Sequence, residues 1–168
     1  RSATVFLACL SGLAPAASAD LLVGRLVDAN GVPVAFGDLD LIYSNGTGVP
    51  TTANQGTDAL GQFAVTVPPG VFDVTFNPPP PPASTALQLV RNAVTVAGTT
   101  NIGDVMLPAG VTITGTVISP AGIGITGVNF DAVDVNDVDQ ATRYDTSVAA
   151  GTFAFNVPPG NYEVRLKP

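Results

Sequence analysis

The chain has 168 residues and a formal net charge of −7, with six Lys plus Arg, thirteen Asp plus Glu, one Cys and no His. Without His there is no Ser-His-Asp triad or imidazole base, and the usual zinc ligand sets fail, so we expect no enzyme and no cofactor. The negative charge disfavours nucleic acid as a partner. Few charged residues (11%), with 18 Gly and 15 Pro, favour an all-β chain.

Residues 1–19 have the pattern of an export signal peptide, truncated at its N-terminus because no initiator Met is present. Arg1 is basic, residues 3–13 are mostly apolar, and Ala17-Ser18-Ala19 is a small-residue cleavage site. The apolar run is too short to span a bilayer. We expect a helical signal peptide, a secreted, periplasmic or cell-surface protein, and no membrane insertion after signal removal. The alternative is a helical N-terminal segment of the mature chain.

Two hairpin-forming segments are predicted next. Leu22, Gly24 and Leu26 alternate with other residues on a strand that ends at the turn Asn30-Gly31. In residues 61–77, an alternating strand, the turn Pro68-Pro69-Gly70 and a second alternating strand follow one another. The side chains predicted to face the core are Phe63, Val65, Val67, Phe72, Val74 and Phe76.

Pro78 to Pro82 form a run of five prolines, which cannot lie inside a sheet. An interdomain linker is one interpretation, but we predict that the run crosses one end of a sandwich. The residues after it are again strand-like up to residue 107. The first β-sandwich is therefore predicted to span residues 20–108.

The chain contains an internal repeat. Residues 61–74 return as residues 151–164, and residues 23–31 return as residues 114–122. A period of about 90 residues is typical of tandem small domains and too long for solenoid repeats. The second sandwich is predicted at residues 109–168, truncated before the counterparts of residues 79–108. Its predicted inward side chains are Phe153, Phe155, Val157, Tyr162, Val164 and Leu166.

One acidic cluster is a weak calcium candidate, consisting of Asp131, Asp134, Asn136, Asp137 and Asp139. Calcium prefers oxygen ligands from loops, but this spacing lacks the glycine and the distal Glu of the familiar calcium loop. We favour a solvated loop between strands. A calcium role predicts that a chelator changes the melting temperature, and no change would exclude it.

Tyr43 and Tyr144 are the candidate carbohydrate-stacking residues, because both are predicted near loops and the chain has no Trp. A sugar site needs two exposed, roughly coplanar rings near one end of a sandwich. Packing against the core or anchoring a loop is the interpretation that we favour for both.

The order of these motifs resembles carboxypeptidase regulatory-like domain repeats of bacterial exported proteins. The residues that carry the resemblance are 23–34, 57–63, 67–76, 115–127 and 151–166. It implies tandem transthyretin-like (prealbumin-like) Greek-key β-sandwiches, and it implies no peptidase activity. The second copy departs from the pattern, since residues 145–150 replace the Thr-Asp turn before Gly151.

The leading functional prediction is a non-catalytic exported module that acts as a spacer, display or protein-binding repeat. Its expected partners are neighbouring domains of a longer chain and an extracellular protein or glycan. The alternative is a carbohydrate-binding module of the starch-binding-like sandwich type, which requires the stacking pair described above.

Overall fold

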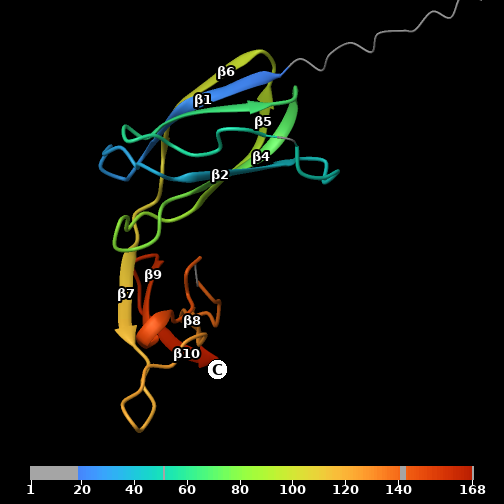
Figure 1. Ribbon diagram of the computed structural model, residues 1–168. Helices are drawn as coiled ribbons and strands as arrows, with labels where there is room; N and C mark the ends of the chain where they lie inside the picture. Colours follow the sequence, from blue (N-terminus) through green and yellow to red (C-terminus); the bar gives the residue numbers. More distant parts are fainter. Residues whose placement is uncertain (1–18, 51, 141–142, 168) are drawn as a thin grey trace, which may run out of the picture.

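The computed structural model describes residues 19–50, 52–140 and 143–167 (Figure 1). The predicted signal peptide lies outside these residues except for Ala19. The described part consists of strands and one short 3-10 turn: β1 (Asp20–Val27), β2 (Asp38–Tyr43), β3 (Gln62–Val67), β4 (Gly70–Asn77), β5 (Leu89–Val96), β6 (Thr99–Met106), β7 (Val111–Thr116), β8 (Asn129–Val133), η1 (Ala149–Gly151), β9 (Thr152–Val157) and β10 (Glu163–Lys167). In the described segments, no helix is long and apolar enough to cross a membrane.

The N-terminal sandwich consists of β1 to β6. One sheet has the order β3-β1-β6, with β1 and β6 parallel, and the other has the order β2-β4-β5. Its core lies between the two sheets, and the side chains that fill it come from alternate positions of the strands. The six inward residues predicted for residues 61–77 are all buried, because each strand turns one face towards the opposite sheet. The proline run lies between β4 and β5, as predicted.

The C-terminal sandwich, β7 to β10, repeats this arrangement. β7 pairs with β9 as β1 pairs with β3, and β8 pairs with β10 as β2 pairs with β4. The register is kept as well, since Gly24 lies opposite Phe63 and Gly115 lies opposite Phe153. The predicted fold class, all-β with tandem Greek-key sandwiches, is confirmed. Within the described residues, the second sandwich has no counterparts of β5 and β6.

The turns are duplicated down to their hydrogen bonds. The Asp28 carboxylate accepts from the backbone N–H of Val32, and the Ser119 hydroxyl accepts from the N–H of Ile123 at the equivalent place. The turn before Gly151 also keeps its shape, because Gly151 N–H donates to Val148 O as Gly61 N–H donates to Asp58 O. The departure at residues 145–150 therefore changes the side chains that support this turn and leaves its backbone bond in place.

Two predicted core residues of the second sandwich are not buried. Val164 is 37% exposed and Leu166 is 51% exposed, whereas their counterparts Val74 and Phe76 are 0% exposed. The prediction was wrong for this strand because it assumed a complete second core. Among the described strands, only β8 pairs with β10, and none takes the places that β5 and β6 have in the first sandwich. Phe155 and Val157, by contrast, are fully buried as predicted.

Candidate functional site: the junction between the sandwiches

The two sandwiches meet end to end. Figure 1 shows β7 to β10 beyond the end of the N-terminal sandwich at which the loop between β4 and β5 lies. Residues 107–110 connect β6 directly to β7. This connection pairs with the loop, because Leu87 N–H donates to Pro108 O at 2.9 Å and Ala86 forms an antiparallel bridge with Ala109. The linker is therefore held by backbone hydrogen bonds.

Gly110 lets the connection lie against the loop. A Cβ atom at this position would be 2.6 Å from the carbonyl oxygen of Thr85 and 2.8 Å from a methyl group of Leu87. Real side chains do not tolerate a 2.6 Å approach to a backbone oxygen without a shift of the chain. The absence of a side chain at residue 110 thus permits the close contact between the linker and the first sandwich.

Asn156 on β9 joins the second sandwich to the first. Its side-chain amide donates to Ser84 O at 2.9 Å and to Ala86 O at 3.2 Å, and its Oδ1 accepts from the Thr112 hydroxyl at 2.7 Å. Asn156 is 5% exposed, so these bonds are shielded from water. A buried amide with its polar atoms bonded fixes a geometry, because any shift leaves donors or acceptors unsatisfied.

Sequence reasoning missed Asn156, since it lies on the strand face opposite the core residues Phe155 and Val157. Its counterpart in the first copy is Thr66, whose backbone pairs with Ala53. A longer amide at an outward position of an otherwise duplicated strand was the available indication. Only the placement of the other sandwich shows that this outward face is covered.

Arg143 adds a charged contact across the junction. Its Nη1 lies 3.9 Å from an Asp38 oxygen and 3.8 Å from an Asp40 oxygen, with all three side chains about half exposed. Exposed pairs at such distances contribute roughly 0–1 kcal/mol, so they orient the surface more than they stabilise it. Asp40 also accepts from the buried Asn77 amide at 2.7 Å, which ties this contact to the end of β4.

The junction encloses little free space. The cavity between the proline segment, Tyr144 and Asn156 has a volume of about 20 Å³, which is about the room of one water molecule. A larger open hollow of about 690 Å³ lies over β1, β3 and β6. There Arg25 Nε donates to Asp104 at 3.0 Å, and this hydrogen bond lowers the pKa of Asp104. The two charges thus satisfy each other.

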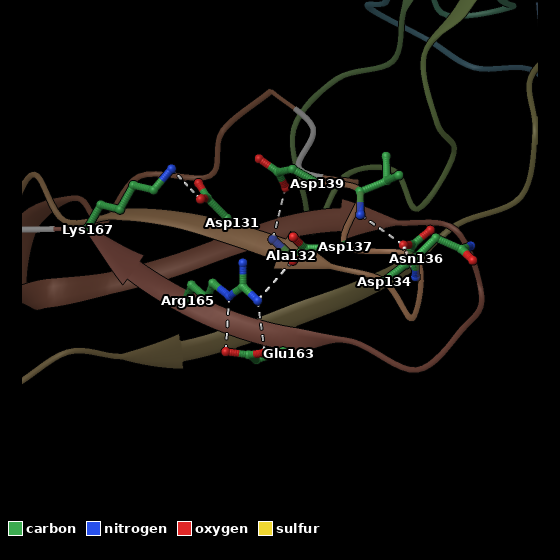
Figure 2. A network of polar contacts seen from close by, with 10 residues as sticks. Asp131, Ala132, Asp134, Asn136, Asp137, Asp139, Glu163, Arg165 and Lys167 are labelled. Carbon is green, nitrogen blue, oxygen red and sulfur yellow. Dashed lines mark hydrogen bonds and ion pairs between the residues drawn. The ribbon is translucent and has the colours of Figure 1, made fainter.

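The calcium candidates lie on β8 and the turn after it, and each carboxylate has its own protein partner (Figure 2). Asp131 pairs with Lys167, and Asp137 lies 3.1 Å from Nη2 of Arg165. Asp139 accepts from the backbone N–H of Ala132 at 3.1 Å. Asn136 is exposed in the turn. In the described residues, no three or more His, Cys, Asp or Glu side chains are grouped as a metal site. Calcium binding stays a prediction.

Asp134 organises this turn. Its carboxylate accepts from the backbone N–H of Asn136 at 2.8 Å and of Val138 at 3.0 Å. These bonds, that from Val138 foremost, favour the charged form and lower the pKa of Asp134 below its ordinary value of 3.8. Asp145 behaves oppositely, because burial raises its pKa.

Replacing Asp134 with Asn is expected to remove part of the acid sensitivity of the second sandwich. A lowered pKa in the folded state contributes stability above pH 3.8 that is lost as the pH falls through the lowered value. Asparagine keeps an acceptor oxygen but does not titrate. Urea unfolding of both proteins should therefore differ most at neutral pH and converge in acid. A constant difference would contradict this.

Tyr43 and Tyr144 are not brought together. Tyr43 at the end of β2 is half-buried against Phe72, with ring centroids 5.0 Å apart. Tyr144 is 45% exposed and lies beside the junction, with the Arg143 guanidinium 5.8 Å from its ring. Arg143 contacts Asp38 and Asp40, towards the opposite end of β2 from Tyr43. The two rings therefore do not form a common stacking platform.

Comparison with known proteins identifies no family. No protein-family model matches the sequence, and no curated protein matches it. Partial structural similarity exists to the Bacillus anthracis TIE protein, with 13% identity, a TM-score of 0.40 and coverage of 89% of this chain and 28% of that one. A Streptococcal ancillary pilin gives 14% identity, a TM-score of 0.42 and coverage of 89% and 54%. The Bacillus cereus major pilin subunit gives 11%, 0.39, and 89% and 57%.

The chain thus spans less than two thirds of the length of these three proteins. At TM-scores below 0.5, the similarities carry no inference about fold or function. The fold assignment rests on the strand pairing described above. The resemblance to carboxypeptidase regulatory-like repeats stays a prediction.

Proposed function

We propose that this chain is a non-catalytic exported structural module in which two sandwiches, divided near residues 108–109, act as a fixed spacer or display element. The observation that carries the proposal is the buried Asn156, which binds the carbonyl groups of Ser84 and Ala86 across the junction. A spacer must hold its two ends at a constant separation. A junction made of backbone pairing and a buried amide supplies this constraint without a ligand.

Chemical content also favours a structural role. The chain has no His, and its one Cys falls in the predicted signal peptide. The carboxylates of the acidic turn are engaged by Lys167, Arg165 and backbone N–H groups. Carbohydrate binding has no geometric support from Tyr43 and Tyr144. Export, the bacterial regulatory-like family and neighbouring domains as partners are parts of the same proposal.

Small-angle X-ray scattering of the full chain tests the fixed spacer. We expect the described residues to fit a single end-to-end arrangement of the sandwiches, as in Figure 1. The fit should hold at low and high salt, because the exposed contacts of Arg143 are screened by salt and the buried bonds of Asn156 are not. A curve that requires many relative orientations at either salt concentration would contradict the proposal.

A further inference from the structure

The second sandwich has two unpaired strand edges in the described chain. β1 lies between β3 and β6, and β4 lies between β2 and β5. Their counterparts β7 and β10 each pair with one described strand, β9 and β8. Since the registers of these pairs are equivalent in the two sandwiches, the free edges of β7 and β10 are those that β6 and β5 occupy in the first. Unpaired edges present backbone N–H and C=O groups to another strand.

The inner faces beside these edges are exposed. Val164 and Leu166 of β10 are 37% and 51% exposed, while Val74 and Phe76 at the same register positions of β4 are 0% exposed. Ile113 on β7 and the adjacent Val117 are half-buried, whereas their counterparts Leu22 and Leu26 are fully buried. The same apolar pattern is therefore covered in one sandwich and uncovered in the other.

The first sandwich shows what covers this pattern. Its β5–β6 hairpin adds one strand to each sheet, antiparallel to β4 and parallel to β1. Val96 and Val105 of the hairpin, and Leu107 just after it, are at most 1% exposed in the core. A hairpin of this kind closes both sheets and covers the facing side chains at once.

A second copy that pairs edge to edge fits the site less well. Such a strand would extend one sheet and leave the faces of Val164 and Leu166 open. The outward side chains of β10 are Glu163, Arg165 and Lys167, which form ion pairs on that face. Charged side chains on an edge strand oppose edge-to-edge association. The geometry therefore favours a two-stranded occupant over a self-paired edge.

We propose that the second sandwich accepts a β-hairpin from a polypeptide segment other than residues 19–167. The hairpin has the chemistry of Leu89–Met106, with one apolar face. One strand pairs antiparallel with β10, the other pairs parallel with β7, and the apolar face covers Ile113, Val164 and Leu166. This interaction surface goes beyond the spacer role and does not depend on it.

A labelled synthetic peptide of residues 87–108, titrated with the full chain, tests the proposal by fluorescence polarisation. Saturable binding is expected, with hydrogen-exchange protection appearing in β7 and β10. A peptide carrying Val105→Asp and Leu107→Asp is expected to bind at least about tenfold more weakly, because its inner face is lost. A matched peptide with Met106→Asp should bind as well as the parent, since Met106 is 56% exposed in the first sandwich.

Variants of the chain make the test specific. Leu166→Asp should weaken peptide binding by at least about tenfold. Val148→Asp should leave binding unchanged, because Val148 is an equally accessible apolar residue in the turn before η1. Circular dichroism checks that both variants stay folded. Absence of binding, equal binding of the inner-face peptide, or chain self-association that the peptide does not inhibit would each overturn the proposal.

Discussion

Replacing Gly61 with alanine is expected to lower the free energy of unfolding of the first sandwich by about 2–5 kcal/mol. Gly61 has φ of +72°, and a Cβ atom there would lie 2.5 Å from Leu26 O and 3.1 Å from Val34 N. These backbone atoms belong to a short ladder, in which Leu26 N–H donates to Gly61 O and Val34 N–H donates to Leu26 O. The new methyl group cannot be accommodated without breaking it.

Gly31 supplies the matched control. Its φ is +79°, but no heavy atom lies within 4 Å of the position that a Cβ would take. Gly31→Ala should therefore cost only the left-handed backbone strain, about 1–2 kcal/mol. Urea denaturation of the two variants separates strain from collision. Equal losses would show that the approach to Leu26 O does not matter.

The strand pairing of this protein could be predicted because its period of about 90 residues appears in the sequence. Alternating Phe63, Val65 and Val67 return as Phe153, Phe155 and Val157, and both sets lie on the equivalent strands β3 and β9. Turn glycines returned at their predicted places for the same reason. Side-chain alternation and turn chemistry are local properties, so a single sequence contains them.

Burial at β10 could not be predicted in this way. Val164 and Leu166 satisfy the local pattern of a buried face, but burial depends on whether other strands are present to cover that face. The junction was missed for a related reason. Asn156 alternates with core residues and therefore looks solvent-facing, and its burial depends on the loop at Ser84 and Ala86, 70–72 residues earlier in the chain. Contacts of this kind have no local signature.

Replacing Asn156 with alanine is expected to lower the free energy of unfolding by about 1–3 kcal/mol, because Ser84 O, Ala86 O and the Thr112 hydroxyl all lose a buried partner. The change should also loosen the junction. Small-angle scattering of the variant should then require several orientations of the second sandwich, while the unfolding of the first sandwich alone stays unchanged. Asn92→Ala is the control, since Asn92 is an exposed amide on β5 whose loss should change stability by at most about 0.5 kcal/mol.

Asn156→Asp distinguishes a hydrogen-bonding role from a filling role. The substitution preserves shape and the acceptor for Thr112, but it places a carboxylate against the carbonyl oxygens of Ser84 and Ala86 in a site that is 5% exposed. Burial and these oxygens disfavour the charged form, so the pKa of the new carboxyl should be raised. At neutral pH the variant should therefore be less stable than Asn156→Ala. In acid the protonated carboxyl can donate to one carbonyl, and the order of the two variants should reverse. If the aspartate variant matches the native protein at neutral pH, the amide donors do not hold the junction.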